Sequence, residues 1–335
     1  MATSDLFLDT ARLDAEYAAL SERCGLVDRS ERGKLALSGP DAKVFLAGQV
    51  TNDTEALAPG DGCYAAFLTH KGKMLGDLRI LDVLPLAGEG SAEVSDEELL
   101  LDTERVALQA LFDMIRRFKI GYQLQLHKRT VERGLLSLIG PDAARIAAAE
   151  ALPTAEHANA QVEIDGIAAL VARTDMGVDL ICDSAVTERL ATALCERGAS
   201  VVSEQAAEIV RVEQGRPRYG VDMDDATIPQ EAGLNERAVS FTKGCYVGQE
   251  TVARLHYKGK PNRLLRGLRL SEPAPAGADL HLGEKQVGRL SSAVLSPTFG
   301  PIGLGLLRRE AQVGASVSVG DGDATATVID LPFRA

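Results

Sequence analysis

The sequence predicts an α+β protein made of two related units followed by a small C-terminal β-barrel. Three observations carry this prediction. The chain has 335 residues, more than a single hydrophobic core usually serves. The string Gly-Pro-Asp-Ala occurs at residues 39–42 and again at 140–143. Beyond residue 261, short apolar runs alternate with glycine and proline, which is typical of small all-β domains.

Composition narrows the class of protein. The chain is 45% hydrophobic and 25% charged, as in ordinary globular proteins. It has no apolar run long enough to predict a membrane helix, and its acidic N-terminus does not resemble a signal peptide, so we expect a cytoplasmic protein. A net charge of −12 argues against a general nucleic-acid coat. Five cysteines without a C-x-x-C pair and five scattered histidines predict a reducing compartment and no metal site.

The first unit is expected within residues 1–130. Residues 34–39 read as a strand that turns at Gly39 into a helix, and residues 65–69 and 74–80 as a hairpin. Residues 85–96 are rich in glycine, serine and acids, which predicts an exposed loop. After a strand at 98–102, Thr103 is expected to cap a helix. The predicted inner face of that helix contains Ala107, Leu111, Met114, Ile115 and Phe118.

The second unit, residues 131–260, repeats this order. A strand ends at the second Gly-Pro-Asp-Ala, a hairpin follows at 167–171 and 178–182, and a helix at about 184–197. Because successive elements recur in order, duplication explains the pattern better than chance. Residues 208–212 read as a further strand. The C-terminal domain, residues 261–335, is expected to form strands at 264–270, 286–295, 303–307 and 324–329.

Cys245 lies in the most irregular segment of the chain, residues 211–254. Gly244 and Gly248 allow a sharp turn there. Lys243 and a helix expected from Gln249 would both favour a thiolate. One interpretation is an exposed thiol that reacts or contacts a metal, and the other is a small buried cysteine in a turn. The residues alone do not separate the two. A Cys245–His256 pair is conceivable, but no general base is evident, so a protease-like nucleophile is disfavoured.

Glu213 follows the strand predicted at 208–212. A carboxylate in that place can accept two hydrogen bonds from adjacent N–H donors of a flat heterocycle such as a pterin or guanine. A salt bridge to Arg211 or Arg216 is the alternative, which the residues alone favour because most glutamates are surface charges.

A basic stretch reverses the charge of the chain locally. It has no acidic residue and contains Arg254, Lys258, Lys260, Arg263, Arg266 and Arg269. It predicts either an anion site, for a polyglutamate tail or RNA phosphates, or a solvated connector between domains. The chain has neither a P-loop nor a Rossmann glycine fingerprint, so ATP or NAD chemistry has no support.

The string at residues 243–250, K-G-C-Y-V-G-Q-E, resembles the signature of the YgfZ family of folate-binding proteins, which are related to the glycine-cleavage T-protein (aminomethyltransferase). Residues 38–46 with 51–53, and residues 211–215 through 223, also match the pattern shared by these families. The resemblance implies a T-protein-like ring of three domains around a central cavity for tetrahydrofolate. It also implies a protein that assists iron–sulfur cluster assembly or repair in client proteins, including tRNA-modifying enzymes. Three packed domains could suffice as a monomer, which we expect.

The same resemblance assigns roles to residues of this chain. It implies that Glu213 holds the pterin and that the thiol of Cys245 is the catalytic group. The other residues that we expect at the folate site are Arg211, Lys243, Tyr246, Gln249 and Asp102.

Two other functions stay open. An aminomethyltransferase that uses tetrahydrofolate would need an Asp beside the folate, and Asp102 is the candidate. However, residues 99–105 lack the family's Asn, and the transferase lacks the cysteine signature. A folate-independent module that binds RNA or protein through residues 254–269 is the third possibility. It predicts steeply salt-dependent tRNA binding without folate affinity.

Overall fold

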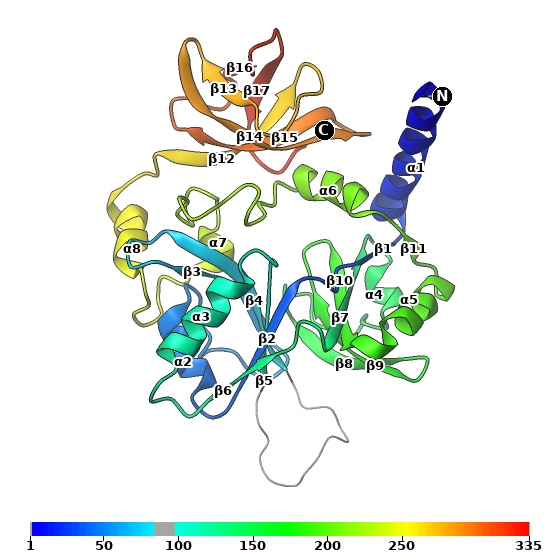
Figure 1. The fold of residues 1–335 in the computed structure, drawn as a ribbon, viewed down its shortest axis with the longest axis vertical. Helices are drawn as coiled ribbons and strands as arrows, with labels where there is room; N and C mark the ends of the chain where they lie inside the picture. Colours follow the sequence, from blue (N-terminus) through cyan, green and yellow to red (C-terminus); the bar gives the residue numbers. More distant parts are fainter. Residues whose placement is uncertain (1, 84–97, 335) are drawn as a thin grey trace.

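The computed structural model of the chain describes residues 2–83 and 98–334. Two α+β units lie side by side, and a β-barrel lies above them (Figure 1). The loop predicted at 85–96 lies outside the described residues. Among the described residues, no helix is long and apolar enough to cross a membrane.

The first unit is built on an antiparallel sheet with the strand order β3-β4-β5-β2-β6. Helices α2 (Ala42–Gln49) and α3 (Leu108–Phe118) cover one of its faces. The strands are β2 (Gly33–Ser38), β3 (Gly62–Leu68), β4 (Met74–Val83), β5 (Glu98–Thr103) and β6 (Gln125–Lys128).

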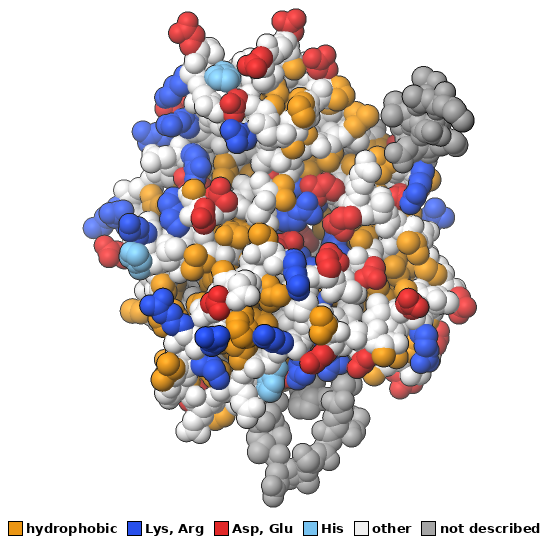
Figure 2. Space-filling model, viewed as in Figure 1, with side chains coloured by type: hydrophobic (Ala, Val, Ile, Leu, Met, Phe, Trp, Pro, Cys, Tyr) orange, Lys and Arg blue, Asp and Glu red, His pale blue; other side chains and the backbone are white. Residues whose placement is uncertain are grey.

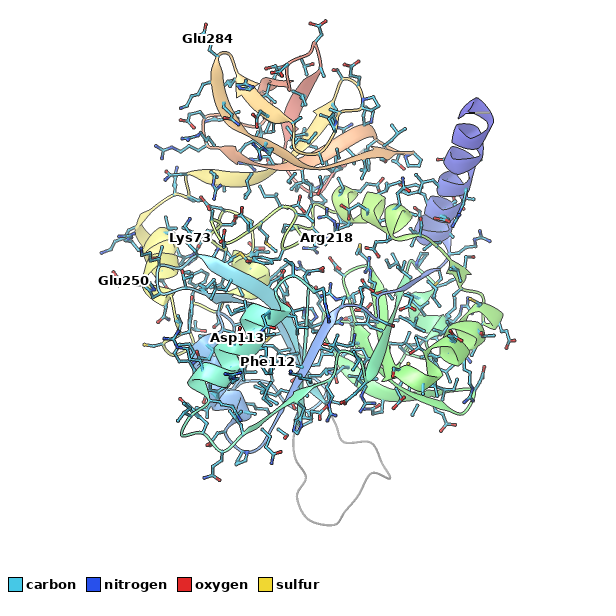
Figure 3. All side chains as sticks on the ribbon, viewed as in Figure 1. Lys73, Phe112, Asp113, Arg218, Glu250 and Glu284 are labelled. Atoms are coloured by element: carbon cyan, nitrogen blue, oxygen red, sulfur yellow. The ribbon has the colours of Figure 1, made fainter. Side chains whose placement is uncertain are left out.

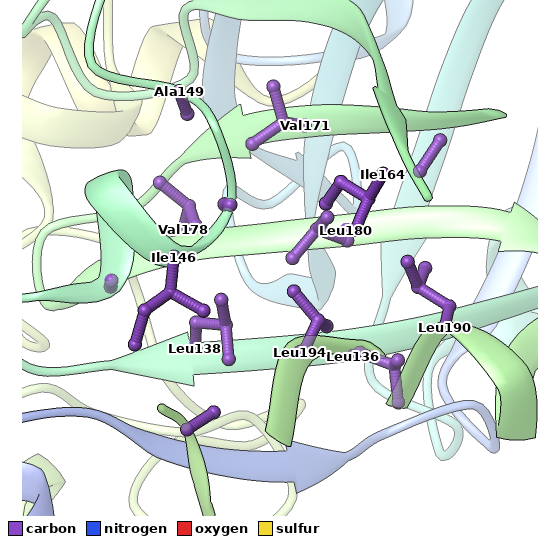
Figure 4. Close-up of a cluster of buried hydrophobic side chains, with 14 of the residues drawn as sticks. Leu136, Leu138, Ile146, Ala149, Ile164, Val171, Val178, Leu180, Leu190 and Leu194 are labelled. Carbon is purple, nitrogen blue, oxygen red and sulfur yellow. The ribbon is translucent and has the colours of Figure 1, made fainter. Parts of the chain in front are cut away.

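The second unit has a sheet with the order β11-β1-β7-β10-β9-β8. Helices α4 (Ala143–Ile146) and α5 (Thr187–Glu196) bury apolar side chains against it (Figure 4). A short 3-10 helix, η1 (Ser184–Val186), leads into α5. The strands are β1 (Gly25–Asp28), β7 (Arg133–Ile139), β8 (Asn159–Ile164), β9 (Ile167–Arg173), β10 (Gly177–Asp183) and β11 (Ser200–Val201).

The predicted repeat is confirmed by the sheet order. The run β3-β4-β5-β2 of the first sheet corresponds to β8-β9-β10-β7 of the second. Each Gly-Pro-Asp-Ala ends a strand and starts a helix one residue after the Asp, and Gly39 and Gly140 have φ of 109° and 125°. A Cβ at Gly140 would lie 2.6 Å from the carbonyl oxygen of Arg23, so glycine is required there.

The repeat differs from the sequence prediction in two respects. Sequence reasoning missed β8, an edge strand in which Gln161 and Glu163 alternate with apolar residues as a half-buried strand requires, so its signal was present in the sequence. In addition, β1 pairs with β7, although the boundary at residue 130 assigns it to the first unit. Chain order alone could not reveal this, because β1 precedes its partner by about a hundred residues.

The uncovered faces of the two sheets pack against each other. Ala36, Leu81 and Leu100 of the first unit meet Leu135, Leu170 and Ile181 of the second in one buried cluster. This contact is therefore surrounded by β4 and β5 of the first unit and by β7 and β10 of the second.

The strand predicted at 208–212 was wrong, because these residues lie in helix α6 (Glu204–Glu213). The run of Glu208, Ile209, Val210, Arg211 and Val212 alternates only briefly, and Ser203 decides for a helix because its hydroxyl caps the N-terminus by accepting from Ala206 N at 3.2 Å. A second correction concerns Thr103. It lies in β5 and donates to the Asp77 carbonyl at 2.5 Å, and α3 begins only at Leu108.

The predicted C-terminal barrel is confirmed, and it is closed in the order β12-β15-β14-β13-β16-β17. Its strands are β12 (Arg263–Leu270), β13 (Asp279–Leu282), β14 (Lys285–Ser296), β15 (Gly300–Arg308), β16 (Ser316–Val319) and β17 (Thr325–Ile329). Helix α6 and the segment after it run between the barrel and the two units (Figure 1). The remaining helices are α1 (Ala2–Glu22), α7 (Asn235–Ala238) and α8 (Gln249–Lys258).

Candidate functional site

A cavity of about 270 Å³ opens where the two sheets and α6 meet. Most of its lining side chains are charged, and both signs are present. Figure 2 shows acidic and basic side chains gathered at the junction of the three parts, where Figure 3 places Arg218, a lining residue. We call this the charged cavity.

Arg79 joins the two units at the wall of the charged cavity. It extends from β4, and its two terminal nitrogens contact Asp102 Oδ2 of β5 at 2.9 Å and Asp179 Oδ2 of β10 at 2.7 Å. Ser137 donates to the other oxygen of Asp179 at 2.6 Å. All three charged side chains of this group are buried.

Asp102, predicted at the folate site, is an ion-pair partner on the wall of the charged cavity. Arg32 Nε donates to its second oxygen at 2.9 Å, so both carboxylate oxygens face guanidinium groups. Burial raises the pKa of Asp102, but Arg32 and Arg79 outweigh burial and hold this pKa below its usual value. A carboxylate held in this way is a poor base.

Asp77, which sequence reasoning missed, lines the same cavity, but its pKa is shifted in the opposite direction from that of Asp102. It is 7% exposed, and Tyr64 donates a hydrogen bond of 2.5 Å to its Oδ2. Burial raises the pKa of Asp77 to about 6, and the bond from Tyr64 opposes this only in part. A carboxyl group that titrates near neutral pH can donate or accept a proton in catalysis. Its signal in the sequence was one of two acids, with Asp82, inside a largely apolar strand.

Glu213 faces a different space, a second cavity of about 590 Å³. We call it the α1 cavity because Tyr17, Leu20 and Ser21 of α1 form part of its wall. Both cavities are lined by Thr174, Asp175 and Met176, so they adjoin. Burial raises the pKa of Glu213, against the hydrogen bonds from Ser296 and Tyr17.

The helical conformation of α6 separates Arg211 from Glu213. Residues two apart lie on the same face of a strand but about 200° apart around a helix. Arg211 accordingly lines the charged cavity and Glu213 the α1 cavity. The Arg211 guanidinium bonds Glu208 at 2.6 Å and 2.7 Å, Asp222 at 2.7 Å and Ser292 at 2.6 Å. Neither Arg211 nor Arg216 forms an ion pair with Glu213 among the contacts of the described residues.

The Cys245 loop, residues 243–248, lines neither cavity. Tyr246 is buried, while Cys245 is exposed. Lys243 Nζ lies 5.0 Å from the Tyr246 ring centre and donates to the carbonyls of Ala47 and, at 2.9 Å, Val50 at the end of α2. Burial lowers the pKa of Lys243 to about 8. The contribution of this loop to a folate site stays a prediction.

The helix predicted from Gln249 is confirmed as α8. Gln249 Nε2 contacts the Gly244 carbonyl at 3.4 Å, which closes the Cys245 loop on itself. Glu250, at the start of α8, lies at the outer edge of the molecule, away from Arg218 (Figure 3). The exposed-thiol interpretation of Cys245 agrees with this geometry, and the buried-turn interpretation does not.

The basic stretch divides into two parts. Arg263 pairs with Glu231 at 2.9 Å, Arg266 with Asp330 at 2.5 Å, and Arg269 donates to the Arg334 carbonyl. Within residues 2–83 and 98–334, no ion pair is found for Arg254, Lys258 or Lys260. Contact with RNA through this stretch stays a prediction. Among the described residues, no group of three or more acidic, cysteine or histidine side chains could hold a metal ion.

The protein thus consists of two α+β units, with two adjoining cavities among their elements, and a closed β-barrel. The chain belongs to the family of the GCVT N-terminal domain, which matches residues 7–243, and residues 263–334 match the glycine cleavage T-protein C-terminal barrel domain. The YgfZ branch within this family stays a prediction.

Individual relatives agree with this assignment. An aminomethyltransferase of Rubrobacter xylanophilus is 28% identical over 334 residues, covering 96% of this chain and 86% of the relative. One from Synechococcus is 29% identical over 338 residues, covering 96% and 90%. The crystal structure of the glycine cleavage system aminomethyltransferase T from Bartonella henselae superposes with a TM-score of 0.82 at 26% identity, covering 96% of this chain and 89% of that one.

Proposed function

We propose that this protein binds tetrahydrofolate in the two adjoining cavities, with the pterin on Glu213. The observation that carries the proposal is a buried carboxylate on the wall of the larger cavity. Adjacent N–H donors of a pterin can bond both oxygens of such a group. A ligand anchored there extends past Thr174 and Asp175 toward Asp77 and the charged cavity.

Changing Glu213 to Gln is expected to weaken the binding of tetrahydrofolate and its 5-formyl form by about 1.5–3 kcal/mol, the range for hydrogen bonds to charged groups. The amide preserves the shape but presents one donor where the pterin needs an acceptor. Titration calorimetry of both proteins measures the difference. Glu163→Gln, on the exposed side of β8, is the matched control. Equal affinity of wild type and Glu213→Gln would place the pterin elsewhere.

We further propose that the folate-bound protein serves iron–sulfur client proteins, including tRNA-modifying enzymes, through the Cys245 loop. Support comes from the way the loop is held: Lys243 and Tyr246 fix it against α2 and the core, while Cys245 is exposed. An exposed thiol on a fixed loop can contact a cluster on another protein, with the remaining ligands supplied by that protein.

Changing Cys245 to Ser is expected to leave tetrahydrofolate affinity unchanged, since Cys245 lines neither cavity. The same change should lower the activity of iron–sulfur client enzymes in a cell that lacks the native gene. Complementation with each variant and an assay of a tRNA modification that depends on a cluster measure this effect. Cys195→Ser, on α5 of the second unit, is the control. Full complementation by Cys245→Ser would remove the thiol from the function.

Aminomethyl transfer to tetrahydrofolate is a second candidate, and Asp77 favours it. The group has the pKa and the cavity position of an acid–base residue, and the relatives described above carry the name aminomethyltransferase. Turnover with an aminomethyl-lipoyl carrier separates the two candidates. In that reaction Asp77, rather than the ion-paired Asp102, is the residue whose change should lower turnover as the loss of a general acid or base does.

A further inference from the structure

Tyr17 of α1 occupies the edge of Glu213 that a ligand would use. Its hydroxyl lies 3.0 Å from Oε1 and 3.2 Å from Oε2. A donor almost equidistant from two carboxylate oxygens sits on the front edge of the group. A ligand with two adjacent N–H donors would use the same edge.

The Tyr17 hydroxyl has one proton, and this limits how the cluster can be bonded. The single proton of Tyr17 points to Glu213, so the contact of 2.8 Å between Tyr17 and Thr298 has Thr298 as its donor. Ser296 donates to Glu213 Oε1 at 2.5 Å, and its oxygen accepts from the backbone of Thr298 at 3.0 Å and Phe299 at 2.9 Å. Ser296 is thus held by the barrel, whereas Tyr17 is held by side-chain contacts alone.

The contact crosses three parts of the molecule. Tyr17 comes from α1, Glu213 from α6, and Ser296 and Thr298 from the end of β14 and the turn after it. Ala19 and Leu20, farther along α1, pack with Val27 and Ile139 of the second unit. Helix α1 therefore has its own anchor, and Tyr17 can turn away from Glu213 without the loss of that anchor.

We propose that Tyr17 is a latch on the α1 cavity that sets both the affinity and the specificity of the ligand at Glu213. This inference rests on the proposed function for the identity of the ligand. A ligand can bond Glu213 only if it displaces the Tyr17 hydroxyl, which bonds both carboxylate oxygens. A ligand with one donor only exchanges one shared hydrogen bond for another, whereas two adjacent N–H donors give each carboxylate oxygen a bond of its own. The latch therefore selects ligands with a bidentate edge, such as a pterin, over ligands with a single donor.

Changing Tyr17 to Phe removes the competing hydroxyl and preserves the ring. We expect titration calorimetry to show tetrahydrofolate binding about five- to tenfold tighter than in wild type, the range of one hydrogen bond. The affinity for p-aminobenzoylglutamate, which lacks the pterin, should not change. Tyr122→Phe, on an exposed ring that packs on Phe45 of α2, is the matched control.

Hydrogen exchange without ligand gives an independent readout. Because Ala19 and Leu20 anchor α1 separately, its amides should exchange at the wild-type rate in both Tyr17→Phe and Tyr122→Phe. Unchanged or weaker tetrahydrofolate binding in Tyr17→Phe, with wild-type binding intact, would overturn the latch and leave the proposed function standing. Failure of wild type and variant alike to bind tetrahydrofolate would overturn both. Faster α1 exchange in Tyr17→Phe would show that Tyr17 holds the helix in place, and would overturn the latch.

Discussion

Replacing Arg79 with Met is expected to lower the free energy of unfolding by about 3–5 kcal/mol, the cost of leaving buried charges without their partner. Arg79 is the cation between Asp102 of the first unit and Asp179 of the second. Without it, Asp102 keeps Arg32, but Asp179 keeps only the hydroxyl of Ser137 among the bonds that these residues form. Urea titration followed by circular dichroism measures the loss.

A surface pair provides the control for this prediction. Lys285 and Glu310 are 2.6 Å apart but largely exposed, so Lys285→Met should change stability by no more than about 0.5 kcal/mol. Adding Asp179→Asn to Arg79→Met should recover part of the loss, because the amide removes the unpaired charge. If Arg79→Met were as stable as wild type, the two units would be joined by their apolar contact alone.

The domain plan of this protein was predictable because it depends on local signals. Two Gly-Pro-Asp-Ala turns, each requiring a glycine with positive φ, marked the repeat, and glycine-punctuated strands marked the barrel. The missed strand β8 and the misread α6 have a different cause. The alternation in β8 was a strand signal that was overlooked, and in α6 five residues were too few to distinguish a period of two from one of 3.6.

The site was less predictable because its chemistry depends on which side chains share a cavity. Reading α6 as a strand placed Arg211 and Glu213 together, whereas the helix turns them toward different cavities. The motif around Cys245 pointed to the correct exposed thiol but not to its place outside both cavities. Asp77 could not be chosen over Asp102 from sequence, since both are acids in apolar strands. Only the guanidinium groups around Asp102 distinguish them.

Changing Asp77 to Asn is expected to stabilise the protein above pH 7, by on the order of 2 kcal/mol, and to leave stability unchanged near pH 4. The folded protein raises the pKa of Asp77 from 3.8 to about 6, chiefly through burial. The native state therefore binds this proton more tightly than the unfolded chain does. The resulting stability is fully present below pH 3.8 and is lost as the pH rises through about 6. Asn resembles the protonated acid at every pH, so it avoids that loss.

Urea midpoints of wild type and Asp77→Asn, measured from pH 4 to pH 8, test this prediction. Asp113→Asn, at an exposed position on α3 (Figure 3), should show no such pH-dependent gain. Tyr64→Phe removes a hydrogen bond that lowers the pKa of Asp77, so the pH at which wild-type stability falls should move upward in that variant. A variant Asp77→Asn that is less stable than wild type at pH 8 would contradict the burial argument.

The same substitution shows what the carboxylate is for. If the protein transfers aminomethyl groups, Asp77→Asn should lower turnover by about 10²–10⁴-fold, the usual contribution of a general acid or base, while making the fold more stable. A buried acid that weakens the protein at neutral pH is costly unless its proton is used. Gain of stability together with loss of turnover would identify Asp77 as a residue kept for chemistry. Gain of stability with unchanged client activity in the cell would instead favour the iron–sulfur role, in which the Cys245 loop acts apart from the charged cavity.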